Sequence, residues 1–159
     1  MNVLVIYESQ FGNTEQIAQA VAVALRTVGP VTLRPAAQVQ PADWQGVDLI
    51  AVGGPTQRHG LPPLLHALLD HLPPDALGPI PALAFDTRYH AARLLTGSAA
   101  TGIAQRLTRA GCLLLVPAES FFVTDQDGPL VEGEVARAGA WAEHALGRLA
   151  PARRLAPAT

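Results

Sequence analysis

The sequence predicts an α/β fold, a doubly wound parallel sheet of five strands in the order 2-1-3-4-5. Three observations lead to this prediction. Short, continuous apolar runs alternate along the chain with segments whose apolar residues recur at helical spacing. The connections between these segments are short, as in parallel sheets covered by helices on both faces. The 159 residues, of which 49% are apolar, suit one domain with a substantial core.

The first half of the chain is predicted to hold three strands and one helix. Val3 to Tyr7 is an apolar run that ends at turn residues, which is typical of a strand buried on both faces. From Thr14 to Val28 the apolar residues recur at helical spacing, and Asn13 or Thr14 is expected to cap this helix. Gly29-Pro30 ends it. There follow a strand at 31–34, a connector at 35–47 with one helical turn around Asp43-Trp44, and a strand at 48–53.

The second half continues the alternation of helices and strands. We predict a helix at 61–72, a strand at 79–85, a polar loop at 86–96, a helix at 97–111 and a last helix at 131–149. The apolar run Cys112 to Val116 predicts a fifth strand that continues past Pro117 toward Val123. Ile103 and Leu107 are assigned to the inner face of their helix. The apolar residues that the last helix carries are Val135, Trp141, Leu146 and Leu149. Residues 1–149 are thus predicted to form one domain, and 150–159 a frayed tail.

The charged residues exclude several functions. The formal net charge of −2 provides no basic footprint for nucleic acid. The chain contains no lysine, and all eleven basic residues are arginine. This excludes any chemistry that requires a lysine, such as a P-loop phosphate site, a Schiff-base cofactor or the switch of a receiver domain.

The single cysteine, Cys112, allows no internal disulfide and is interpreted as a buried small hydrophobe. A phosphatase nucleophile would need an arginine that closes the loop after it, and Leu113 to Pro117 follow instead. The apolar segment at the N-terminus, about five residues, is too short for a signal peptide or a membrane span. We therefore expect a cytoplasmic protein that binds neither membranes nor nucleic acid.

Four loops are expected at the carboxyl ends of the strands, where such sheets bind ligands: 8–14, 54–60, 86–96 and 117–130. In the first loop, Ser9 and Thr14 offer hydroxyls, Asn13 offers an amide, and Gly12 permits a turn that aims backbone N–H groups inward. With the positive end of the following helix, these neutral donors suit a phosphate monoester. An ordinary capped strand–helix turn uses the same residue types, so the composition alone fits both interpretations.

The string Ser-Gln-Phe-Gly-Asn-Thr-Glu at 9–15 resembles the phosphate loop of the flavodoxin-like, FMN-binding family, whose pattern is Thr/Ser-x-x-Gly-x-Thr. Gly53-Gly54-Pro55-Thr56 resembles the second flavin loop of that family, and Phe85 to Arg88 lies at the position of the third. The segment from Gly128 to Glu134, which leads to Trp141, is similar to the last helix of many members. The resemblance extends over about 1–149 and implies FMN as the cofactor.

Transferred residue by residue, the resemblance implies that Ser9, Asn13 and Thr14 contact the FMN phosphate. The backbone N–H groups from Gln10 to Thr14, with Gly12 among them, would do the same. Phe11 stands where the long-studied members have a threonine, which removes one hydroxyl donor. It is expected to cover the ribityl chain, to face a partner, or to serve only as a shield against solvent.

The second flavin loop departs further from the family. The implied cofactor-binding residues there are Pro55, Thr56, Gln57, Arg58, His59 and Gly60. Electron-transfer members usually place Trp, Tyr or Met in this loop, so Arg58 or His59 is the candidate to stack on the ring. An exposed loop histidine is the alternative for His59. Gly60 is a candidate for the peptide that meets the flavin N5.

In the third loop the resemblance implies contacts from Thr87, Arg88 and Tyr89, whose backbone N–H groups would face the pyrimidine edge of the flavin. Tyr89 is the best candidate for the missing stacking aromatic, with a buried packing role as the alternative. We interpret Asp86 as a cap at the strand end rather than a flavin ligand. Ser98 is interpreted as a helix N-cap, since no Gly-x-Ser-x-Gly pattern surrounds it.

No metal site and no catalytic residue are assigned. His66 and His71 lie five residues apart on one predicted helix, rather than the three or four that would share a face for a metal ion. Phe121 and Phe122 lie at the end of the fifth strand. One of them is expected in the core, and the other near the flavin rim.

Three functions are compatible with these residues. The first is a flavodoxin-like FMN protein that carries electrons between protein partners. The second is an FMN-dependent oxidoreductase that passes hydride from NAD(P)H to a quinone-type small acceptor; the chain lacks the insertions that build the oligomeric pocket of such relatives. The third is a flavodoxin-fold binding module that has lost FMN. In the first two the cofactor performs the redox chemistry and the protein supplies position and electrostatics.

Overall fold

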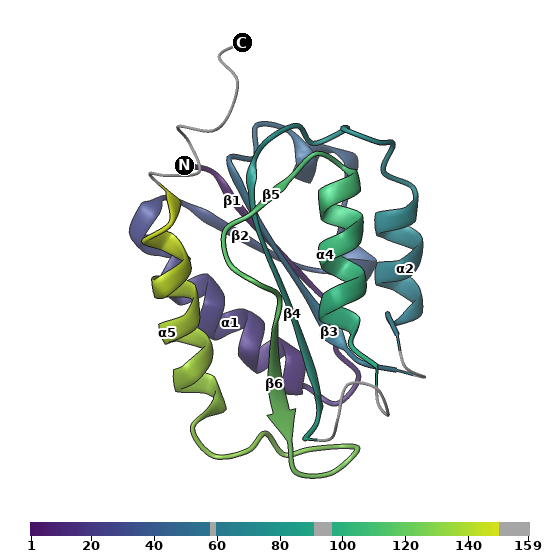
Figure 1. Ribbon diagram of the computed structural model, residues 1–159, viewed down its shortest axis with the longest axis vertical. Coiled ribbons are helices and arrows are strands. Elements are labelled where there is room, and N and C mark those ends of the chain that lie inside the picture. Colours follow the sequence, from purple (N-terminus) through teal and green to yellow (C-terminus); the bar gives the residue numbers. More distant parts are fainter. Residues whose placement is uncertain (58–59, 91–96, 150–159) are drawn as a thin grey trace.

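The structure, a computed structural model, describes residues 1–57, 60–90 and 97–149, arranged around one parallel sheet (Figure 1). The strands are β1 (Val3–Tyr7), β2 (Val31–Pro35), β3 (Leu49–Pro55), β4 (Pro81–Tyr89), β5 (Leu113–Leu114) and β6 (Glu119–Val123). The helices are α1 (Asn13–Leu25), α2 (Pro63–Asp70), α4 (Ala99–Arg109) and α5 (Glu134–Leu146). The order β2-β1-β3-β4-β5 confirms the predicted topology, and β6 also pairs with β4. The tail predicted at 150–159 lies outside the described residues.

Helices cover both faces of the sheet: α1 and α5 lie on one face, and α2 and α4 on the other (Figure 1). The side chains of β1 alternate between these layers. Val3, Val5 and Tyr7 pack with α1 and α5, whereas Leu4 and Ile6 pack in the layer of α2 and α4. All five residues are buried, which confirms that this strand is covered on both faces.

The fifth strand is divided into two short pieces on either side of Pro117. Leu113–Leu114 pairs with the start of β4, and Glu119–Val123 pairs with its end from Phe85 to Tyr89. Proline lacks the N–H that a sheet ladder needs, which accounts for the interruption. The predicted continuation of the strand past Pro117 is confirmed.

Strand β4 is longer than predicted, and the loop expected at 86–96 begins too early. The residues Asp86, Thr87 and Arg88 are polar but buried within the strand. Their polarity made them resemble a loop. They remain in the sheet because β3 pairs with Asp86 and Thr87 on one side and β6 pairs with 85–89 on the other.

The helices are shorter than predicted, and the N-cap predicted for the first helix was wrong. Helix α1 is capped by Gly12, in the left-handed conformation with φ of 86°, so neither Asn13 nor Thr14 is its N-cap. Val135 of α5 is 42% exposed, because small residues rather than Val135 pack against α1. The inner face of α5 consists of Ala138, Ala142 and Ala145, with Trp141 partly buried beside them. Ile103 and Leu107 of α4 are fully buried, as expected.

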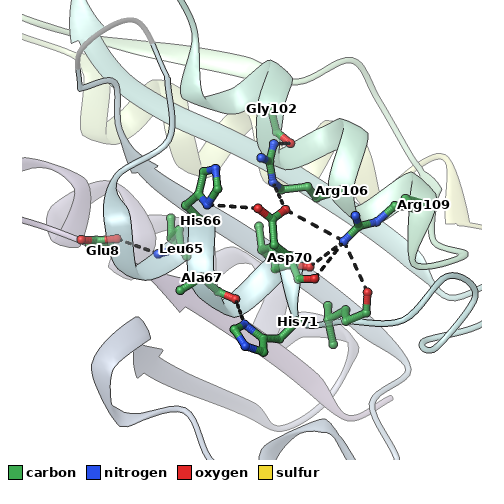
Figure 2. Close-up of polar contacts among 11 residues, drawn as sticks. Glu8, Leu65, His66, Ala67, Asp70, His71, Gly102, Arg106 and Arg109 are labelled. Carbon is green, nitrogen blue, oxygen red and sulfur yellow. Dashed lines mark hydrogen bonds and ion pairs between the residues drawn. The ribbon is translucent and has the colours of Figure 1, made fainter.

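Figure 2 shows how polar contacts join α2 to α4 and to the end of β1. Asp70 accepts a hydrogen bond from Arg106 Nε at 2.7 Å and pairs with His66 Nδ1 at 3.0 Å. Glu8, which directly follows β1, accepts from the backbone N–H of Leu65 at 2.9 Å and so satisfies a donor in the first turn of α2. His71 bonds the carbonyl of Ala67 instead. Within the described parts of the chain, no group of three potential metal ligands occurs.

Candidate functional site

A cavity of about 420 Å³ lies where β1, β3, β4 and β6 end at their carboxyl termini. It draws residues from all four of the loop regions that the sequence pointed to. Its lining consists of Ser9, Gln10, Phe11, Asn13, Thr14, Pro55, Thr56, Gln57, Thr87, Arg88, Tyr89, Val123 and Gln126. Among the described residues of this lining, Arg88 is the only charged one and none carries a carboxylate side chain.

The first wall of the cavity is the turn between β1 and α1. The left-handed turn at Gly12 reverses the chain so that α1 begins directly over the cavity. Ser9 Oγ accepts hydrogen bonds from the backbone N–H groups of Gly12 at 3.1 Å and Glu15 at 3.3 Å. Within the described chain, the N–H groups of Gln10, Phe11, Asn13 and Thr14 contact no protein acceptor. Such free N–H groups at a helix N-terminus form an anion site.

Asn13 and Thr14 are buried and connect this turn to other parts of the site. The Nδ2 of Asn13 donates to the carbonyl of Asp127 at 3.1 Å, which ties the turn to the loop after β6. The hydroxyl groups of Thr14 and Thr87 share a hydrogen bond of 2.7 Å between α1 and β4. Phe11, by contrast, is 49% exposed at the rim of the cavity.

The second wall is the segment that follows β3. Gln57 and Gly60 form an antiparallel bridge with backbone hydrogen bonds of 3.0 and 2.8 Å. The Nε2 of Gln57 donates to Gln10 Oε1 at 3.0 Å, so the first and second loops are in contact. Gly60 takes part in the bridge but does not line the cavity. The candidate stacking residues Arg58 and His59 lie outside the described residues.

The third wall is the end of β4. Tyr89 is 41% exposed, and its hydroxyl group donates a short hydrogen bond to Asp125 in the turn after β6. This bond raises the pKa of the Tyr89 phenol and lowers the pKa of the Asp125 carboxyl below its usual value. Tyr89 is therefore fixed at the mouth of the cavity by its hydroxyl group rather than buried in the core.

Arg88 lines the cavity, but its guanidinium group is buried and occupied elsewhere. Its Nη1 donates to the carbonyl of Gly97 at 2.9 Å, and its Cζ lies 5.8 Å from the ring centre of Phe122. Phe122 also contacts His90 and does not line the cavity, so the expected flavin-rim position of this ring is not what the structure shows. Its neighbour Phe121 is fully buried in the core, as predicted for one of the pair.

Asp86 was predicted to cap the end of its strand, but it lies within β4 and caps the start of α4 instead. It is fully buried and accepts from the Ala100 N–H at the start of α4. Ser98 is the N-cap of the same helix and accepts from the Thr101 N–H, which matches its predicted role. Val123 and Gln126 are lining residues that the sequence did not single out. They belong to the region 117–130, and only the pairing of β6 with β4 brings them to the cavity.

Comparisons with known proteins agree with this fold. A family model described as a flavodoxin domain matches residues 4–90, which is more than half of the chain. The chain belongs to the flavodoxin family. Membership of this family implies a flavin cofactor. No curated protein sequence matches the chain significantly.

Among solved structures, this flavodoxin-family chain superimposes on flavodoxin 1 and flavodoxin 2 from Bacillus cereus. The TM-scores are 0.77 and 0.76 at 18% and 21% identity, over 94% of this chain and 99% and 100% of the flavodoxins. A flavodoxin, WrbA-like protein from Agrobacterium tumefaciens gives a TM-score of 0.71 at 18% identity, over 96% of this chain and 98% of that one. At these identities the agreement shows a shared fold.

The residues of the cavity fit a flavin. The free N–H groups above α1 and the neighbouring hydroxyl groups suit a phosphate, while Tyr89, Phe11, Pro55 and Val123 offer apolar surface beside it. No carboxylate side chain is among the described residues of the lining. Across the described residues, no helix combines the length and hydrophobicity needed to cross a bilayer.

Proposed function

We propose that this protein binds FMN in the cavity at the carboxyl ends of the strands and carries electrons between redox partners. Residues 1–149 are the proposed binding domain. The observation that carries the proposal is the convergence of four separate loop regions on one cavity beside the unpaired N–H groups at the start of α1. Two of the fifteen residues expected to bind the cofactor lie outside the described residues, and eleven of the other thirteen line that cavity. Membership of the flavodoxin family supports the same cofactor.

The phosphate group of FMN is proposed to bind at the N-terminus of α1. The backbone N–H groups of Gln10 to Thr14 would donate to it, together with the side chains of Ser9, Asn13 and Thr14. Because these donors are neutral, the positive end of the helix dipole supplies the favourable electrostatics. Ser9 already accepts from Gly12 and Glu15, so its hydroxyl hydrogen is directed to the ligand.

The ring of FMN is proposed to lie between the second and third loops. Tyr89 is the proposed stacking residue, since its hydroxyl is fixed by Asp125 and its ring stands at the cavity mouth. Pro55, Thr56 and Gln57 form the opposite wall, and we propose Arg58, His59 and Gly60 as its continuation. Bound FMN would supply the capacity to accept and release electrons, and these residues hold and shield it.

A spectroscopic titration tests this proposal. The purified chain, stripped of any flavin, is titrated with FMN while the flavin absorption and fluorescence are followed. We expect a 1:1 complex with a perturbed flavin spectrum and no comparable binding of riboflavin, which lacks the phosphate. A chain that leaves both signals unchanged at all FMN concentrations would contradict the proposal and favour a binding module without flavin.

A second measurement separates the electron carrier from the reductase. The FMN-loaded protein is mixed with NADPH or NADH and a soluble quinone, and nicotinamide oxidation is followed. An electron carrier is expected to show no turnover under these conditions, yet to be reduced by a chemical reductant and reoxidised by a redox protein such as cytochrome c. Sustained nicotinamide oxidation would assign the protein to the NAD(P)H-dependent reductases instead.

A further inference from the structure

Asp86 is a fully buried carboxylate in the middle of the described fold. Three donors converge on its Oδ2 atom. The hydroxyl group of Ser98 donates at 2.8 Å, the hydroxyl group of Thr56 at 3.0 Å, and the backbone N–H of Ala100 at 3.0 Å. Such a set of donors, at the positive end of α4, stabilises a negative charge. Asp86 thus does more than cap a helix, because it also contacts the segment after β3.

Thr56 links this buried carboxylate to the cavity. It lines the cavity, and its Oγ1 donates to Asp86 while accepting from the Ala99 N–H at 2.9 Å. Its backbone N–H donates to the carbonyl of Thr87 at 3.0 Å. The side chain and backbone of Thr56 are therefore fixed by three different partners. The cavity wall that begins at Thr56 takes its position from Asp86 and from the start of α4.

The second carboxylate oxygen of Asp86, Oδ1, is in a different environment from Oδ2. Oδ1 is buried and has no hydrogen-bond partner among the described residues. A buried charged group with an unsatisfied oxygen costs folding free energy. A carboxylate that is only a cap would have no need of this charge, since asparagine presents the same acceptor to the three donors. The negative charge of Asp86 therefore indicates a role other than capping the helix.

We infer that Asp86 is a positioning residue for the flavin, which fixes the Thr56 wall and places a buried negative charge behind it. The inference rests on the proposed binding of FMN. A fixed negative charge in a medium of low dielectric disfavours the addition of electrons nearby. The charge of Asp86 therefore weakens the binding of reduced FMN relative to oxidised FMN. The hydrogen bond between Thr56 and Asp86 supports the binding of both forms.

The variant Asp86→Asn removes the charge but keeps the hydrogen bond from Thr56. Its amide oxygen can still accept from Thr56, Ser98 and Ala100, and its NH₂ group takes the place of the unpartnered Oδ1. We expect the dissociation constant of oxidised FMN to change less than about threefold. The ratio of the dissociation constants for oxidised and reduced FMN should rise about tenfold, because the charge that disfavours reduced FMN is removed.

A charge-matched control is Asp75→Asn, which removes an exposed carboxylate outside the cavity lining. Asp75 has φ of 59°, a conformation that asparagine also tolerates. This variant is expected to leave the ratio unchanged. A redox titration of each FMN-loaded variant gives the ratio, and a thermal melt of the flavin-free chain gives stability separately.

Two substitutions at Thr56 test its hydrogen bond to Asp86. They keep the inference testable if Asp86→Asn fails to fold. Thr56→Val removes the hydroxyl and should weaken the binding of oxidised and reduced FMN alike, by about tenfold, with the ratio unchanged. Thr56→Ser retains the hydroxyl and should restore binding. An Asp86→Asn chain that folds and keeps the wild-type ratio would overturn the inference, as would wild-type affinity in Thr56→Val. A wild-type chain without FMN binding would overturn the proposed function together with it.

Discussion

Thr14 illustrates how single residues serve both the fold and the site. Its side chain is almost fully buried, and its hydroxyl meets that of Thr87 at 2.7 Å, so one hydrogen bond joins the first turn of α1 to the end of β4. Thr14 also lines the cavity, next to the free N–H groups at the start of the helix. A change at this position is therefore expected to affect both stability and ligand affinity.

The substitution Thr14→Val removes the hydroxyl and keeps the shape of the side chain. We expect a loss of about 1 kcal/mol of stability, since the Thr87 hydroxyl is left without its buried partner. The dissociation constant of FMN should rise about tenfold, as measured by fluorescence titration. Thr108→Val is the control, because Thr108 bonds the Ala104 carbonyl on the outside of α4, away from the cavity. Equal FMN affinities in the two variants would contradict a role for Thr14 in the site.

At the scale of elements, β6 is an edge strand whose open side is covered by a side-chain pair from α5. Glu134 Oε2 accepts from the Phe122 N–H at 2.7 Å, and Arg137 donates to the Ser120 carbonyl. The two side chains also bind each other at 2.7 Å. Exposed strand edges are open to pairing with other chains, so these contacts protect the edge. They also fix the strand that delivers Val123 to the cavity.

This pair predicts a pH dependence of stability. Burial acts to raise the pKa of Glu134, but hydrogen bonds from Arg137 and Phe122 outweigh it, and the pKa is lowered from 4.5. A carboxylate with a lowered folded-state pKa stabilises the fold above its unfolded-state pKa and loses that contribution as the pH falls through the folded value. Glu134→Gln should therefore lower the free energy of unfolding by about 2 kcal/mol at pH 7.

Urea denaturation of both chains at pH 7 and in steps below pH 4.5 checks the prediction. The difference between wild type and Glu134→Gln should shrink steadily as the pH falls. Glu143→Gln, in the same helix but with an exposed side chain and no ion pair among those of the described residues, is the control and should show little difference at any pH. A difference in the free energy of unfolding between wild type and Glu134→Gln that stays constant across this pH range would mean that the charge of Glu134 is not the source of stability.

Two glycines predict opposite effects of the same substitution. Gly12 adopts φ of 86°, a conformation that costs an alanine about 1 kcal/mol, although the space around its Cβ position is open. Gly139 lies within α5, also with open space, and has no positive φ. Gly12→Ala should thus destabilise the protein by about 1 kcal/mol. Gly139→Ala should stabilise it by roughly 0.5–1 kcal/mol through helix propensity. Chemical denaturation measures both, and a neutral Gly12→Ala would argue against the left-handed turn.

At the scale of the whole molecule, the sheet separates two helix layers and buries Cys112 within the layer of α2 and α4. Its side chain is 3% exposed, and burial raises the pKa of the thiol to about 12. The cysteine should therefore be inert to thiol reagents in the native state. Modification then reports on unfolding rather than on surface chemistry.

Labelling with a chromogenic disulfide reagent at pH 8 measures this. We expect slow, sub-stoichiometric reaction of the native protein and rapid reaction of one thiol per chain in 6 M guanidinium chloride, on the order of a 1,000-fold difference in rate. The rate in intermediate denaturant should follow the fraction unfolded by circular dichroism. Fast reaction without denaturant would show that the layer of α2 and α4 opens independently of the rest.

Much of the fold was predictable because its signals are local. The run Val3 to Tyr7 and the spacing of Ile17, Val21 and Leu25 identify a buried strand and its helix from short segments, and these residues are buried as expected. The continuation of the last strand past Pro117 was also predicted from a local run. The loop that was wrongly predicted to begin at residue 86 has a different cause: Asp86, Thr87 and Arg88 resemble a loop in isolation, and only their neighbouring strands keep them in the sheet.

By itself, the sequence determined the order of elements, the strand topology and the family, since apolar periodicity and the string at 9–15 depend only on neighbouring residues. The tertiary structure alone decided that Gln126 reaches the cavity, that Arg88 turns to Gly97, and that Asp86 holds Thr56. These contacts join residues that are not neighbours in the sequence. Their geometry arises only when the sheet packs between its helix layers, because a side chain's partners are set by pairing register and burial rather than by local composition.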